Sequence, residues 1–269
     1  MLEEEKQEGN QPVNMLPGAR RIMRLQSRPE PLYLLLAINR GSTDFVHLVQ
    51  AVGLGIGIPP SPSTTSHNIE ELVQETLLTK RGRARATIYE LTPLGRDSVL
   101  AFGTFHRRLL NPLVEYWKDR TAERLGSVGA EIIDDLSRFQ TAIGTSPVEI
   151  DSEDFRAVPG VLHIMHALGG TTRLDILASL KGREKLPFKE VHRSLRYGTT
   201  PASTLSNMIS ELEQMGLVGR DVQGHGTWTR LTSLGEVTLD GFMDYHSSLR
   251  DSIVEGFKEQ LKENFGISL

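Results

Sequence analysis

Four cations in one short stretch are the residues of this chain best suited to chemistry. Lys80, Arg81, Arg83 and Arg85 lie in the segment KRGRAR, with a glycine between the second and third of them. Clustered like charges repel one another, and the phosphates of a polyanion relieve that repulsion when they bind. The segment therefore indicates a surface that binds phosphates, and a solvated hairpin tip is the alternative explanation.

A run of small polar side chains lies upstream of these cations. The run follows Ser61 and Pro62, which are typical of a helix start. Its members are Ser63, Thr64, Thr65, His67 and Asn68. Such side chains hydrogen-bond to base edges when the start of a helix enters the major groove of DNA. Serine, threonine and asparagine also favour helix starts for structural reasons alone, and for any single residue that explanation is equally good.

The second half of the chain carries a similar but less basic set. Its polar run at a helix start consists of Thr200, Ser203, Thr204, Ser206 and Asn207. We expect these side chains to be exposed, and the apolar side chains between and after them to face inward, namely Leu205, Met208, Ile209 and Leu212. The cations that would contact phosphates are Lys189, Arg193 and Arg196 before the run and Arg220, His225 and Arg230 after it.

These two sets belong to an internal repeat. Residues 71–95 return, altered but recognisable, as residues 211–235, at a constant offset of 140 residues. The residues of the first copy that meet an identical residue at this offset include Ser63, Thr64, Ser66, Ile69, Leu72, Gln74, Leu77, Thr87, Leu91, Thr92, Leu94 and Phe102. A match of this length without gaps predicts two copies of one structural unit.

Each copy predicts a helix, a short β-hairpin and a second helix. Apolar residues first recur at helical spacing, with Ile69 and Leu72 in the first copy. Turn glycines then precede segments of alternating character, TIYEL in the first copy and TWTRL in the second. In the next helix of the first copy, Thr92 is placed as the N-cap and Pro93 as the first helical residue.

The helix, the basic hairpin and the LTPLG segment at residues 91–95 resemble the winged helix-turn-helix regulators of the PadR, HxlR and MarR families. The resemblance implies a mainly α fold with small β-hairpin wings, built as two tandem winged helix-turn-helix domains joined by a helical linker. It also implies a recognition helix in the major groove and a wing that touches the DNA backbone or the minor groove. The helices after each wing would form a homodimer, or the two domains of one chain would act as a monomeric pseudo-dimer.

Charges divide the chain into four segments. Residues 1–15 form an acidic tail predicted to be disordered, and residues 16–120, the first winged-helix domain, hold 14 Lys and Arg against 9 Asp and Glu. Residues 121–155 form a helical and acidic linker with 8 acids against 2 Arg. Residues 156–269 form the second winged-helix domain with its C-terminal helix, and their 13 cations balance 13 acids. The net charge of -4 thus conceals a basic first domain.

Further patterns predict the remaining helices. A short basic helix or arm covers residues 17–28 and carries four arginines. The next helix covers residues 30–39 and is closed by Gly41, and Ser42 caps the helix after it. The helix over residues 96–120 is interrupted near Pro112. Thr172 and Asp175 predict a capping box, and residues 237–265 predict a closing amphipathic helix.

Several classes of function lack support in the sequence. The chain has no cysteine, which excludes disulfides, thiolate zinc sites and thiol redox sensing. Apolar runs stay short of the roughly 20 residues that span a membrane. A phosphate loop, a nucleophile elbow and paired carboxylates at usable spacing are all missing, and His163 and His166, one helical turn apart, lack a third ligand. We therefore expect neither an enzyme nor a bound cofactor or metal.

Sequence-specific transcriptional regulation is the function that these patterns favour. We expect double-stranded DNA as the partner, bound by two recognition helices and basic wings. A bacterial or archaeal cytoplasmic protein associated with the nucleoid fits this composition. One alternative is a tandem winged-helix scaffold of a chromosome-organising or replication complex, which the acidic linker and the overall charge favour. A plasmid-type replication initiator is a third reading, and such proteins are usually more basic.

Overall fold

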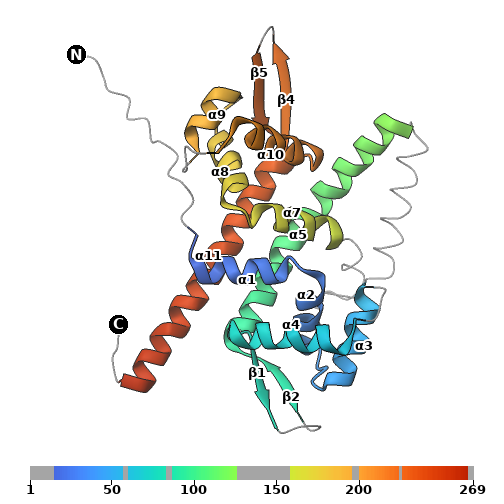
Figure 1. Cartoon of the computed structure of the whole chain (residues 1–269), viewed down its shortest axis with the longest axis vertical. Coiled ribbons are helices and arrows are strands. Elements are labelled where there is room, and N and C mark those ends of the chain that lie inside the picture. Colours follow the sequence, from blue (N-terminus) through green and yellow to red (C-terminus); the bar gives the residue numbers. More distant parts are fainter. Residues whose placement is uncertain are drawn as a thin grey trace. The chain divides into compact units, whose positions relative to one another are not determined.

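The structure is a computed structural model that describes residues 15–56, 60–82, 87–125, 158–195, 200–223 and 226–265. These residues are mainly helical and include two small antiparallel sheets (Figure 1). They separate into two compact units. The continuous unit comprises residues 170–239, and the split unit comprises residues 15–169 together with residues from 240 onward.

The split unit contains eight elements of the described chain and most of a ninth. In chain order these are α1 (Pro17–Gln26), α2 (Pro29–Asn39), α3 (Phe45–Ile56), α4 (Pro62–Gln74), β1 (Leu78–Arg81), β2 (Ile88–Leu91), α5 (Pro93–Leu125), α7 (Val158–Leu168) and, from residue 240, α11 (Ser233–Phe265). Strands β1 and β2 form an antiparallel hairpin in which Leu78 lies opposite Leu91. Three helices, a hairpin and a long helix thus follow one another from α2 to α5.

The continuous unit repeats this order. Its elements are α8 (Thr171–Leu180), β3 (Leu186–Pro187), α9 (Phe188–Ser194), α10 (Ala202–Gln214), β4 (Val218–Gln223), β5 (Gly226–Leu231) and the first residues of α11. The hairpin β4–β5 has the same register as β1–β2, since Val218 lies opposite Leu231. Strand β3 adds a third, antiparallel strand beside β5.

The two copies also have the same junction between hairpin and helix. Thr92 accepts a hydrogen bond on its hydroxyl from Gly95 N–H at 2.9 Å, and Thr232 accepts one from Gly235 N–H at 3.0 Å. Both are N-caps, as expected for Thr92. A Cβ on Gly95 would lie 2.1 Å from the carbonyl oxygen of Leu77, so only glycine fits where the helix meets the hairpin. The sequence repeat is therefore a repeat of structure.

An aromatic cluster joins α5 to α11 in the core of the split unit. The ring of Phe105 stacks on Tyr245 at 5.7 Å between centroids and meets Phe242 edge-on at 6.2 Å. All three side chains are at most 2% exposed. The Tyr245 hydroxyl donates to the side-chain carbonyl of Gln26 in α1, and Gln26 is also fully buried. Buried aromatic pairs of this kind contribute about 0.5–1.5 kcal/mol beyond the burial of their area.

Several local predictions are corrected by the structure. Helix α5 runs through Pro112 without a break, because its length and its buried face outweigh one missing N–H. Helix α8 begins at Thr171 after Gly170, with no side-chain cap, so the predicted capping box of Thr172 and Asp175 does not form. At the start of α3, Asp44 rather than Ser42 accepts the backbone N–H of His47.

The unit boundaries differ from the segments drawn on the sequence at residues 120 and 156. Helix α7 and the part of α11 after residue 239 belong to the split unit with the first copy, although both were assigned to the second domain. Gly160 in α7 shows why, because a Cβ there would lie 2.9 Å from the side chain of Leu113 in α5. The predicted acidic tail at 1–15, apart from residue 15, and the predicted linker from residue 126 to 155 lie outside the described residues.

Candidate nucleic-acid interface

Helix α4 begins with a cluster of hydroxyls, as its sequence predicted. Ser61 is the N-cap and accepts a hydrogen bond from Thr64 N–H at 3.1 Å. Its hydroxyl also lies 2.8 Å from the Ser63 oxygen and 2.7 Å from the Thr64 oxygen. The first turn has no acidic residue, so the partial positive charge of the helix start is not neutralised there. Ser63, Thr64 and His67 are exposed, and an anion or a base edge would have access to them.

Two of the predicted contact residues in α4 are buried instead. Thr65 is 1% exposed and Asn68 is fully buried. Asn68 donates to Glu30 in α2 at 2.6 Å and accepts from Arg28, so its amide holds α4 against the start of α2. Both are therefore removed from the candidate interface.

The repeat itself contains the signal that Thr65 and Asn68 face inward. At the offset of 140 they correspond to Leu205 and Met208, which are apolar and were predicted to face inward. The same offset pairs the exposed Ser206 with Ser66, which is also exposed and was missed as a contact residue.

Helix α10 presents its polar residues as predicted. Ser203, Thr204, Ser206 and Asn207 are exposed, whereas Thr200 just before the helix is half-buried. Leu205, Ile209 and Leu212 are buried, and Met208 is partly covered. No acidic residue lies in the first turn. The amino-terminal halves of α4 and α10 thus both present hydroxyl groups at a helix start, and α10 adds the amide of Asn207.

The first hairpin carries exposed cations on β1. Lys80 and Arg81 are exposed, and the Arg81 guanidinium lies 3.3 Å from Glu90 on β2. Arg83 and Arg85 lie outside the described residues. Opposite Lys80, Tyr89 is buried, and burial raises the pKa of its hydroxyl above the ordinary value, with the Glu70 carboxylate adding to the rise.

In the second hairpin the cations are paired with acids. Arg220 donates from Nε to Glu213 in α10 at 2.7 Å, and Arg230 lies 3.8 Å from Asp221 across the hairpin. His225 lies outside the described residues. This hairpin has much less free positive charge than the sequence suggested.

Helix α9 supplies two exposed cations beside this hairpin. Lys189 and Arg193 are both exposed, as predicted for the outer face of this helix, and Arg196 lies outside the described residues. Lys185, just before β3, lies 5.6 Å from the ring centroid of Trp228 on β5, in a cation–π arrangement. The basic groups of the continuous unit are therefore spread over α9 and the adjoining loop more than over the hairpin.

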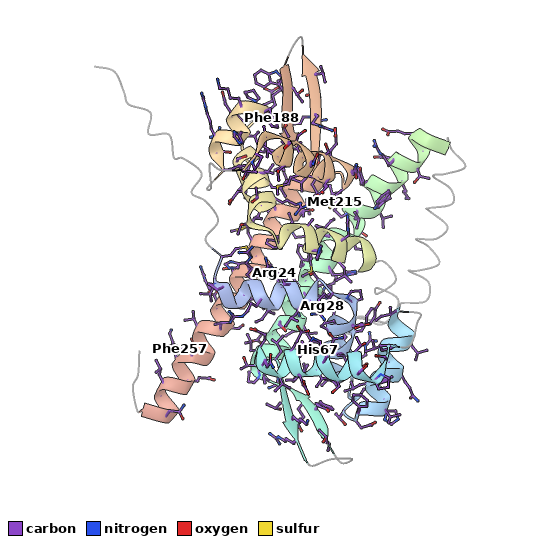
Figure 2. All side chains as sticks on the ribbon, viewed as in Figure 1. Arg24, Arg28, His67, Phe188, Met215 and Phe257 are labelled. Atoms are coloured by element: carbon purple, nitrogen blue, oxygen red, sulfur yellow. The ribbon has the colours of Figure 1, made fainter. Side chains whose placement is uncertain are left out.

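The arginines of α1 contact the protein itself. Arg21 donates to Glu75 at 2.9 Å. Arg28, which lies just after α1 and is labelled in Figure 2, donates to Glu71 at 2.7 Å. Arg20 donates to the carbonyl oxygen of Gly169 at 3.2 Å. These contacts join α1 to the end of α4 and to the turn after α7. Phosphate binding by these arginines would compete with these pairs.

The helix after the first hairpin packs on the helix after the second within the split unit. Besides the ring contacts of Phe105, Arg108 in α5 forms an ion pair with Asp244 in α11. A Cβ on Gly241 would lie 3.2 Å from Arg108 and 3.3 Å from Phe105, so α11 approaches α5 closely at this point. The helix that follows the first hairpin and the helix that follows the second are thus in direct contact through Phe105 and Arg108.

Neither a metal site nor a membrane helix is found where the structure describes the chain. Groups of three or more potential ligands do not occur among the described residues, and His163 and His166 are both exposed on α7. Within the same residues, no helix combines the length and the apolar character needed to cross a membrane.

Comparison with models of known protein families and with the sequences of characterised proteins gives no match for this chain.

Proposed function

We propose that the chain is a sequence-specific DNA-binding regulator that carries two winged helix-turn-helix modules. The observation that supports this most strongly is that three helices, a hairpin and a long helix occur twice in the same order. In this proposal α4 and α10 act as the recognition helices. Both helices expose hydroxyl groups in their first turns and have no acid in the first turn, and α10 also exposes the amide of Asn207. Such groups hydrogen-bond to base edges in the major groove, while cations on hairpins and neighbouring helices hold phosphates.

The two modules would bind DNA with unequal strength. On the first hairpin Lys80 is exposed in addition to Arg81, which lies beside Glu90, whereas on the second hairpin Arg220 and Arg230 both lie beside acids. The first would therefore contribute more of the salt-dependent affinity, and the second would rely on Lys189, Arg193 and the helix start. The pairing of α5 with α11 supports a pseudo-dimer within one chain, which would read a site with two unequal halves.

The test is binding to random duplexes, followed by selection, over a series of salt concentrations. Selected DNA should bind wild type tightly, and the double change Lys80→Ala, Arg81→Ala should lower the slope of log affinity against log salt by about two. The matched control is Lys258→Ala, Lys262→Ala, which removes the same charge from exposed positions late in α11. We expect this control to leave the slope unchanged. A wild-type protein that selects no sequence, with equal slopes for both variants, would refute the proposal.

A protein-interaction scaffold is the second candidate, and the paired arginines favour it. Glutamates neutralise Arg21, Arg28, Arg173 and Arg220. The apolar Val222 on the second hairpin is 77% exposed, which suits a protein contact better than a phosphate contact. If this candidate is right, Val222→Ser will abolish assembly with the partner, and DNA selection will return no consensus.

A further inference from the structure

A cavity of about 360 Å³ lies in the continuous unit, between α9, α10 and the hairpin β4–β5. The described residues that line it are Phe188, Ser206, Ile209, Arg220, Thr227 and Thr229. Phe188 projects from α9 beside the base of the hairpin (Figure 2). The volume falls in the range of about 300–1,000 Å³ that is common for small-molecule sites.

One wall of this cavity carries a buried hydroxyl without a partner. Thr229 is 1% exposed, and within the described part of the chain its Oγ1 makes no hydrogen bond. A buried hydroxyl is nearly always hydrogen-bonded, and one that is left unpaired in a native fold points to a missing partner. A guest in the cavity would supply that partner, since Thr229 can both donate and accept.

The two copies differ at one position that lines the cavity. Thr229 lies opposite Arg220 in the second hairpin, as Tyr89 lies opposite Lys80 in the first. Tyr89 is buried, so at this position the first copy holds a phenol ring where the second holds only a small hydroxyl-bearing side chain. At this position of the repeat the second copy therefore has the smaller side chain.

The chemistry of the walls selects an uncharged, planar ligand. Phe188 and Ile209 supply apolar surface, and the Phe188 ring is held parallel to His192 at 6.4 Å between centroids. The only charged side chain among the described lining residues, Arg220, is already bonded to Glu213. A charged ligand would have to break that pair or lie beside a like charge. Hydroxyls together with an aromatic ring in one cavity suit a flat molecule with polar edges.

We propose that this cavity is a regulatory site for a small uncharged heteroaromatic molecule of one or two rings. The ligand would stack on Phe188 and exchange a hydrogen bond with Thr229.

Residues at the cavity form hydrogen bonds near both ends of α10. The His192 ring stacks on Phe188, and its Nε2 atom lies 2.7 Å from the carbonyl oxygen of Thr200, just before α10 begins. At the other end, Arg220 bonds to Glu213 near the last turn of α10. Ser206 lines the cavity and is also one of the exposed side chains assigned to base contacts. An occupied cavity would therefore change DNA binding by α10, a consequence that rests on the function proposed above.

Binding is tested by methyl NMR on the full chain with labelled threonine. The probes are a library of uncharged one-ring and two-ring heteroaromatic amides, and the matching carboxylic acids form the charged set. We expect amides to shift the Thr229 methyl signal and to bind more tightly than their acids. Thr229→Tyr, which installs the residue of the first copy, should weaken binding at least tenfold. Thr229→Val, which keeps the cavity and removes the hydroxyl, should weaken it about fivefold.

The matched control is Thr79→Tyr, which adds the same ring at an exposed position of the first hairpin and should leave binding unchanged. The proposal is overturned if no amide shifts the Thr229 signal, if acids bind more tightly than amides, or if Thr229→Tyr binds as wild type does. Should Thr229→Tyr fail to fold, unchanged affinity in Thr229→Val would overturn it as well.

The coupling between the cavity and DNA binding is tested separately, by measuring the affinity of the protein for the selected duplex with and without the best amide. We expect the amide to change duplex affinity severalfold in wild type and not in Thr229→Tyr. Amide binding in a protein that selects no DNA would refute the proposed function and leave the ligand site standing. Equal duplex affinity with and without saturating amide would overturn the coupling.

Discussion

Replacing Gly95 or Gly235 by alanine should break the junction that both copies share. A Cβ on Gly95 would lie 2.1 Å from the Leu77 carbonyl oxygen, and one on Gly235 would lie 2.0 Å from that of Leu217. Real Cβ contacts essentially never fall below 3.0 Å, so helix and hairpin must separate by about 0.9 to 1.0 Å. That separation breaks the hydrogen bond from Thr92 N–H to the Leu77 carbonyl, now 3.1 Å long.

The cost of this change has two parts. An unpaired buried carbonyl costs about 1–3 kcal/mol, and the added overlap costs about 1–3 kcal/mol. We therefore expect each variant to lose about 2–6 kcal/mol of unfolding free energy, a large share of the total for a small domain. Urea denaturation followed by circular dichroism measures the loss. Amide hydrogen exchange should locate it in the split unit for Gly95→Ala and in the continuous unit for Gly235→Ala.

The matched control is Gly256→Ala in α11. Nothing lies within 4 Å of the added Cβ there, and alanine is the better helix former by up to about 1 kcal/mol. This variant should be neutral or slightly stabilised. The reasoning is wrong if Gly95→Ala or Gly235→Ala unfolds at the same urea concentration as Gly256→Ala.

Three further predictions concern the split unit. Tyr245→Phe leaves the carbonyl of buried Gln26 without its donor and should cost about 1–3 kcal/mol in urea denaturation; an unchanged midpoint would contradict it. Pro112→Ala should raise the thermal midpoint, because a proline inside a helix costs about 3 kcal/mol; a lower midpoint would show that the ring packs usefully. Burial lowers the pKa of His246 below its ordinary value of 6.5; the charge of Arg250 adds to this effect and that of Asp251 opposes it. The Nε2 atom of His246 accepts a hydrogen bond from Leu16 N–H. The unfolded chain therefore binds the proton more tightly, so stability should fall as the pH drops below about 6.5, and His246→Gln should flatten that fall in denaturation curves at pH 5 and 7.

The elements that the sequence predicts well are those with a repeated or a capped pattern. The hairpins and the caps at Ser61 and Thr92 were expected because two aligned copies, or a hydroxyl before a proline, restrict the local conformation strongly. The uninterrupted course of α5 through Pro112 was not expected. A proline within a helical pattern predicts a break, and the packing contacts that keep this helix continuous cannot be read from the sequence. Strand β3, two residues long, has no periodicity that a pattern could reveal.

The candidate interface was predicted only in part, for a geometrical reason. A polar run at a helix start shows that some of its members are exposed, but not which ones, because the phase of a helix is read from apolar residues. In α4 the first apolar residue is Ile69, after the whole polar run. In α10 Leu205 lies inside the run and sets the phase. Ion pairs such as Arg220 with Glu213 join residues seven positions apart in different elements, which no charge count reveals.

The division of the chain through α11 has a consequence for synthesis on the ribosome. The continuous unit emerges as one stretch and has all its residues once residue 239 has left the exit tunnel. The split unit begins first but lacks Phe242, Tyr245 and Leu249, all buried in its core, until the last part of the chain emerges. The half of the protein that is made first is therefore completed last, and its exposed α5 core face is the segment that a nascent-chain chaperone would shield in the meantime.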